Sequence, residues 1–250
     1  MDQVVDTETA KEFMRETLEV VDVDELAKIC VEVEEKSAWF RSTLSRESLP
    51  ELTEQGYHDL LRRIFVVRGK ARVALEGYDL AAVREWMAEL LYGLDDPGRR
   101  FEVFAGRLDG LSDNLRVDVT SELLHFAQPE RHWLWTRWMW DPKTKTGALP
   151  LVTTAAYDLD GESLGEIYMK VGRAVTFVHE VGGAAGFQKI SSSIFGTDVF
   201  LCCVYVIYAY TVLRMRMTQE FNKVMPELSE FCRRLLGVHR KPSQTPATTK

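Results

Sequence analysis

The sequence has little of what would assign the chain to a specialised class of protein. Its four cysteines, Cys30, Cys202, Cys203 and Cys232, include no CxxC pair, so they predict neither a zinc knuckle nor a redox motif. No apolar stretch resembling a signal peptide occurs near the first residue, and we therefore expect a cytoplasmic protein with reduced thiols. The formal net charge of -7 provides no overall attraction to nucleic acid or anionic lipid.

The sequence also lacks an apolar run long enough to cross a bilayer without including a charge. Residues 199–213 are uncharged, but such a run is shorter than the roughly 20 residues that a membrane span needs. Extending it backward includes Asp198, whose insertion into lipid is costly. We therefore expect a central apolar helix at about 198–222 that is buried in the protein, and we do not expect a membrane partner.

Motifs that would fix a reaction or a cofactor are missing as well. There is no GxSxG nucleophile motif, and the glycine-rich segment 181–191 places Lys189 too late for a phosphate-binding loop. None of the five histidines has another histidine or a suitable pair of carboxylates one helical turn away, so we predict no metal and no cofactor. An enzyme remains an alternative, in which His125, His132 or His179 acts with a carboxylate in a pocket between helices.

Helical periodicity is what the sequence does contain, over most of its length. Thr53 and Asp79 are suitable caps for two amphipathic helices, which Gly69 and Gly93 are placed to end. We predict a mainly α, single multi-helix globular domain over 1–237 and a disordered tail over 238–250. One short β-hairpin around 133–153 is left open, because the tryptophans there are spaced by two and a turn signal follows them.

Acidic charge is concentrated at the N-terminus. Residues 1–54 contain 15 acidic and 6 basic residues, whereas the rest of the chain is nearly neutral. The predicted helices within 8–45 are therefore acidic, which would repel phosphates and suit a basic surface.

Four of the six tryptophans lie within residues 133–140. Because tryptophan and arginine dominate the energetics of protein interfaces, this segment and its basic neighbours predict a binding surface. The candidate residues of this surface are Arg131, His132, Trp133, Trp135, Arg137, Trp138, Trp140, Lys143 and Lys145. We therefore expect a non-catalytic interaction or assembly protein that binds a protein partner or self-associates. A core location for the rings is the competing interpretation, since large aromatic side chains are usually buried.

A nucleic-acid-associated module is a further alternative. Aromatic rings beside basic residues can stack nucleobases while the cations contact the backbone. The stretch 120–130, with leucine, leucine, histidine and then proline, and the following aromatic run to Asp141, resembles a segment of helical DNA-associated proteins, including glycosylase-like and restriction-associated domains. This resemblance covers about a tenth of the chain. The helix-hairpin-helix glycine turn of such glycosylases is not recognisable upstream, so we assign Asp141 no catalytic role.

Overall fold

The computed structural model describes residues 4–67, 69–216 and 226–239, and the regular structure in these ranges is helical. In chain order the α-helices are α1 Thr7–Val20, α2 Val23–Thr43, α3 Glu54–Arg63, α4 Gly69–Glu76, α5 Leu80–Tyr92, α6 Pro97–Arg107, α7 Asp113–Ala127, α8 Leu149–Val152, α9 Leu164–Glu180, α10 Gly182–Ala185, α11 Ile194–Arg216 and α12 Leu228–Leu235. Two 3-10 turns, η1 Leu49–Glu51 and η2 Phe187–Lys189, complete the regular elements. The predicted mainly α globular fold is confirmed.

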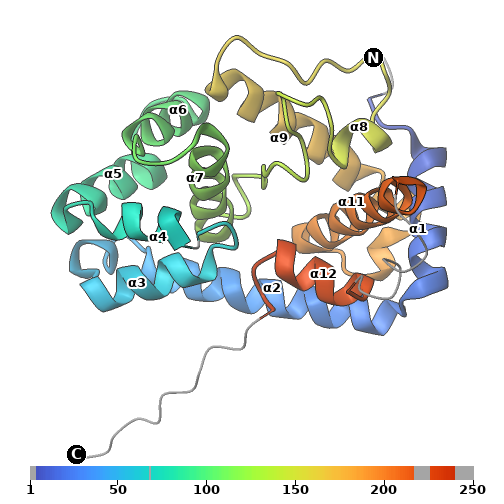
Figure 1. The fold of residues 1–250 in the computed structure, drawn as a ribbon, viewed down its shortest axis with the longest axis horizontal. Helices are drawn as coiled ribbons and strands as arrows, with labels where there is room; N and C mark the ends of the chain where they lie inside the picture. The colour runs from blue at the N-terminus through green and yellow to red at the C-terminus, as the bar shows by residue number, and fades with distance from the viewer. Residues whose placement is uncertain (1–3, 68, 217–225, 240–250) are drawn as a thin grey trace, which may run out of the picture.

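Two buried helices organise the packing, and the long helix α2 connects them. α7 packs against α2, α5 and α6, while α11 packs against α1, α2 and α12. Figure 1 shows α2 along one side of the molecule, where it reaches both the α3–α7 group and the α11–α12 group. Apolar side chains from both groups belong to one hydrophobic core.

The central apolar helix begins earlier than predicted. α11 starts at Ile194 rather than at 198, and its described part ends at Arg216, so the predicted end at 222 lies outside the described residues. Residues 240–250 of the predicted tail lie outside them as well. By length and hydropathy alone, Ile194–Val212 could cross a membrane, but 61% of that window is buried within the protein.

The acidic helices predicted within 8–45 are α1 and α2, and part of their charge is matched inside the chain. Arg233 of α12 pairs with Glu25 at 2.8 Å and with Glu32 at 2.7 Å, both on α2. The acidic face of α2 thus meets a basic residue of its own chain, and these ion pairs hold α12 beside α2.

The hairpin that the sequence leaves open around 133–153 does not form, because the structure describes no strand in this segment. Its turn is present, however, as an isolated bridge between Asp141 and Thr146. Across this turn the carbonyls of Trp138 and Met139 accept the backbone N–H groups of Ala148 and Leu149, at 2.9 and 3.0 Å, whereas the backbone farther upstream bonds to side chains of α7. The N–H of Trp135 donates to Ser121 Oγ at 2.6 Å, and the N–H of Arg137 donates to Asp118 Oδ1 at 3.0 Å. These bonds hold residues 135–137 against α7 in an irregular conformation.

Candidate functional site

The candidate site is built on α7, whose residues 117–127 are all buried. Asp118, Glu122 and His125 lie at intervals of four and three residues along this helix, so their side chains leave it on the same side. Buried ionisable groups are costly unless they find partners, which makes the surroundings of these three residues informative.

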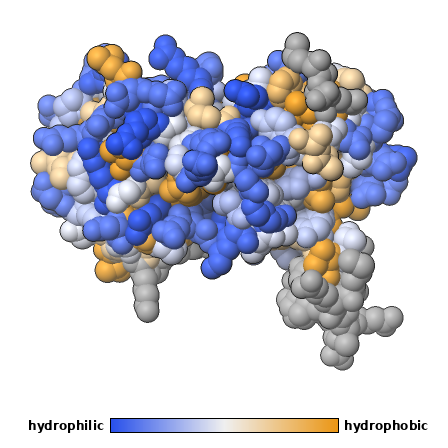
Figure 2. Space-filling model, turned by 90° about the horizontal axis from the view of Figure 1, so that it is seen from above, coloured by the Kyte–Doolittle hydropathy of each residue, from blue (hydrophilic) through white to orange (hydrophobic). Residues whose placement is uncertain are grey.

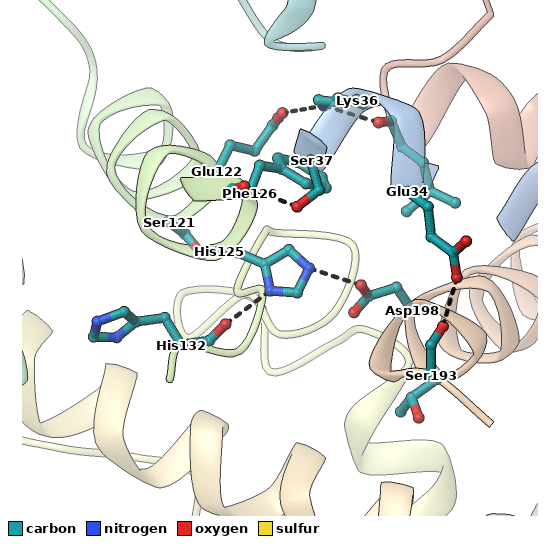
Figure 3. Close-up of polar contacts among 12 residues, drawn as sticks. Glu34, Lys36, Ser37, Ser121, Glu122, His125, Phe126, His132, Ser193 and Asp198 are labelled. Carbon is teal, nitrogen blue, oxygen red and sulfur yellow. Dashed lines mark hydrogen bonds and ion pairs between the residues drawn. The ribbon is translucent and has the colours of Figure 1, made fainter. Parts of the chain in front are cut away.

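Glu122 has a counter-charge of its own. Lys36 of α2 places Nζ 2.7 Å from Glu122 Oε2 and also donates to the carbonyl oxygen of Leu236 at 2.9 Å. The same ammonium group lies 3.9 Å from the centroid of the Phe126 ring. Burial raises the pKa of Glu122 and lowers that of Lys36, while the charge of each partner opposes the shift in the other. Figure 3 shows this pair between α2 and α7.

His125 links α7 to α11 through Asp198. Its Nδ1 lies 2.8 Å from the carbonyl oxygen of His132, which can only accept, so Nδ1 carries a proton. Its Nε2 lies 2.8 Å from Asp198 Oδ2, and both side chains are fully buried. A hydrogen bond therefore joins His125 Nε2 and Asp198 Oδ2 (Figure 3). This pair joins α7, the segment after it and α11 at one point.

Asp118 lies at the wall of a cavity of about 250 Å³. The wall also includes Glu122, Arg137, Trp138 and Asp141, and it is completed by Phe65, Val66, Thr136, Thr146, Tyr205 and Leu235. Arg137 and Thr146 are exposed, whereas Asp118, Glu122 and Thr136 are buried. The cavity therefore extends from the protein surface to the ionisable side chains of α7.

The carboxyl group of Asp118 has no ion-pair partner among the described residues. Its Oδ1 accepts the backbone N–H of Arg137, and within the described ranges no group donates to its other oxygen. Burial raises the pKa of Asp118 to about 7, and the negative charges of Glu122 and Asp141 act in the same direction. The Arg137 N–H and guanidinium oppose this shift. Asp118 is thus poised to exchange a proton near neutral pH.

Two further polar groups in the wall lack partners. The hydroxyl of Thr136 and the indole N–H of Trp138 are buried without a hydrogen bond to any described residue. A buried polar group without a partner is uncommon and requires an explanation. Together with Asp118, these groups place three polar side chains with unmet hydrogen-bonding capacity beside one cavity.

The charged members of the predicted surface and its rings differ in exposure. Arg131, Arg137, Lys143 and Lys145 are exposed. The side chains of His132, Trp135, Trp138 and Trp140 are buried, and Trp133 is half-buried. A continuous face of four exposed tryptophan rings is therefore absent from this described segment. Of the nine predicted residues, only Arg137 and Trp138 reach the cavity.

The buried members of this run have identifiable packing roles. Trp135 stacks on Phe101 with ring centroids 5.5 Å apart and donates its indole N–H to the carbonyl of Trp140 at 3.0 Å. His132 Nδ1 lies 3.1 Å from the hydroxyl of Tyr168. Burial, followed by the charge of Arg100, lowers the pKa of His132 to about 4, so this residue is neutral at pH 7.

Sequence reasoning missed the acidic residues that define the cavity. Asp118 and Glu122 lie one helical turn apart with the polar residues Thr120 and Ser121 between them, and such a pattern is also typical of a solvent-facing stripe. Their one available signal was a spacing of four residues, which places two carboxyl groups on one side of a helix. Asp141 was considered and given no role, yet it lies in the same wall.

The arrangement suits a small ligand better than a metal ion. In the part of the chain that the structure describes, no group of three or more histidine, cysteine or acidic side chains could hold a metal. A cavity with a few convergent polar groups and a residue of shifted pKa is typical of ligand sites. Comparison of the chain with protein-family models, curated proteins and solved structures finds no match.

Proposed function

We propose that this protein binds a small polar molecule in the cavity beside Asp118. The observation that carries the proposal is a buried carboxyl group without a counter-charge at the wall of a cavity of about 250 Å³. This volume is slightly below the range for drug-sized ligands, so it suits a small metabolite. The unpartnered groups of Thr136 and Trp138 support the proposal, because both residues line the cavity and their hydrogen-bonding capacity is unmet.

The test uses a panel of small amines, amino acids, sugars, carboxylates and nucleosides. Binding is measured by thermal stabilisation of the full chain and by tryptophan fluorescence, since Trp138 belongs to the wall. A ligand present at about 100 times its Kd should stabilise the protein by roughly 2.7 kcal/mol. Absence of any stabilising compound in this panel would overturn the proposal.

A cavity-filling variant locates the binding. Val66→Trp places a large ring in the wall and should abolish the stabilisation. Val73→Trp is the matched control, because Val73 is exposed on α4 and lies outside the cavity lining. A compound that stabilises both variants equally binds elsewhere, and this result would also overturn the proposal.

General acid–base catalysis by Asp118 is a second candidate function. The observation favouring it is the pKa of about 7, which matches the requirement for proton transfer at neutral pH. A ligand that binds in the cavity and is chemically altered during incubation would support this function, provided that Asp118→Asn retains binding and loses turnover.

The interaction or assembly hypothesis now depends mainly on exposed cations rather than on rings. It would use Arg131, Arg137, Lys143 and Lys145, with Trp133 as the partly exposed aromatic side chain. On the face shown in Figure 2, most of the coloured residues are hydrophilic. The hydrophobic side chains on this face form small, separate patches. Light scattering and oligonucleotide titration of Arg137→Ala test the protein-partner and nucleic-acid forms of this hypothesis. The cavity provides the more specific chemistry, and we favour it.

A further inference from the structure

The charges around the cavity indicate the chemical class of its ligand. Lys36 neutralises Glu122 through the contact of 2.7 Å. Arg137 and Asp141, which contribute one charge of each sign, lie in the outer, more exposed part of the wall. Asp118 is left without a balancing charge when it is ionised. One added positive charge would therefore neutralise the lining.

Aromatic rings provide the second part of the argument. Trp138 and Tyr205 both line the cavity, with ring centroids 6.3 Å apart and planes inclined at 48°. Phe65 contributes a third ring to the wall. Aromatic faces attract organic cations, and the attraction is stronger where water is excluded. A carboxylate beside several rings is the combination that such a cation requires.

We infer that the ligand of this cavity is a small organic ammonium ion, held by the carboxylate of Asp118 and the rings of Trp138, Tyr205 and Phe65. This inference rests on the proposed function and adds the ligand class to it. An anion would meet three carboxyl groups and a single guanidinium in the wall. A divalent metal would lack a sufficient set of ligands among the described residues. A neutral molecule would leave ionised Asp118 uncompensated.

The ionisation of Asp118 gives the binding a defined pH dependence. Because the pKa of Asp118 is about 7, the carboxylate is mostly present at pH 8 and mostly protonated at pH 5.5. The other charged groups facing Asp118 are Glu122, Arg137 and Asp141. Affinity for an ammonium ion should therefore fall about 30-fold from pH 8 to pH 5.5, following the ionised fraction.

The experiment compares cations with uncharged molecules of the same shape. The probes are choline and its carbon analogue neohexyl alcohol, n-butylammonium and butan-1-ol, and acetate as an anion. Calorimetric titration at pH 8 should give at least about tenfold tighter binding of one ammonium probe than of its neutral analogue. Asp118→Asn should greatly reduce this difference, since the amide retains an oxygen for the Arg137 N–H but has no charge, and only the attraction of the rings remains. Asp113→Asn, on the same helix and exposed, should leave it unchanged.

Two outcomes contradict the inference in different ways. If a neutral or anionic probe binds at least as tightly as the ammonium probes, and Val66→Trp abolishes that binding, the ligand class is wrong and the proposed function stands. If no probe binds to the wild-type protein, while a compound of the wider panel that carries no ammonium group binds in the cavity, the ammonium class is again wrong. If neither the probes nor the panel bind, the inference and the proposed function both fail. Thermal unfolding of Asp118→Asn shows whether that variant retains its fold.

Discussion

Asp118 and Glu122 lie one helical turn apart on α7, and both side chains are buried, but they have different surroundings. Glu122 contacts the ammonium group of Lys36, which is in turn bonded to the carbonyl of Leu236. Asp118 accepts one backbone N–H and otherwise lies at the wall of a cavity. A buried charge with its own partner is explained by the folded structure alone. A buried carboxyl group without one is better explained by a ligand.

The largest expected effect on the free energy of unfolding comes from removing Lys36, the partner of Glu122. Lys36→Met leaves an uncompensated buried carboxylate and should lower the free energy of unfolding by about 3–5 kcal/mol. Urea denaturation measures this loss, and Lys28→Met is the control, because Lys28 pairs with Glu25 at the exposed surface. A loss below about 1 kcal/mol would show that Glu122 does not depend on Lys36.

A double substitution sharpens the same comparison. Lys36→Met combined with Glu122→Leu removes both charges and should recover most of the stability lost in the single variant. Failure to recover would mean that the other contacts of the lysine, with the carbonyl of Leu236 and the ring of Phe126, account for the loss.

The second prediction concerns the other paired carboxyl group. Asp198→Ala removes the partner of His125 Nε2 and should lower the free energy of unfolding by about 3 kcal/mol. Asp198→Asn should cost less, because its amide can donate to a neutral imidazole nitrogen. The ratio of the two losses, measured by denaturation at one pH, tests the hydrogen bond. Equal losses would contradict its importance.

The smallest expected effect on the free energy of unfolding concerns Asp118, and its size depends on pH. The folded-state pKa of about 7 lies above the ordinary value of 3.8, so the folded protein binds the proton more tightly than the unfolded chain does. The stability due to this proton is complete below about pH 4 and is lost as the pH rises through 7. The free energy of unfolding of Asp118→Asn, relative to that of the wild type, should therefore rise by roughly 2–3 kcal/mol between pH 5 and pH 8. A pH-independent difference between the two proteins would contradict the raised pKa.

Helical features that depend on neighbouring residues could be predicted from the sequence. The side chains of Thr53 and Asp79 cap α3 and α5, and Gly93 follows the end of α5, as expected. Gly69, however, begins α4 instead of ending α3, which already stops at Arg63. Ile64 and Val67 between the two helices are buried in a turn, and a buried apolar side chain does not reveal whether its backbone is helical.

The candidate site was harder to predict from the sequence than the helices, because its chemistry depends on contacts between residues that are distant along the chain. Glu122 is separated from Lys36 by 86 residues, and His125 is separated from Asp198 by 73. Without these contacts, the polar residues of α7 resemble a solvent-facing stripe. The tryptophan run was identified as unusual, but its sequence left core and surface locations open. Its backbone bonds to Asp118 and Ser121 turn the segment toward α7.

The contacts between α2 and α12 have a consequence for biosynthesis. Lys36 and Leu236 are 200 residues apart, and Arg233 reaches back to Glu25 and Glu32. At about 5–20 residues per second, a ribosome needs on the order of 10–40 s to add the intervening chain. During this interval α2 exists without its last partner. The nascent chain therefore completes these polar contacts of α2 only after α12 has emerged.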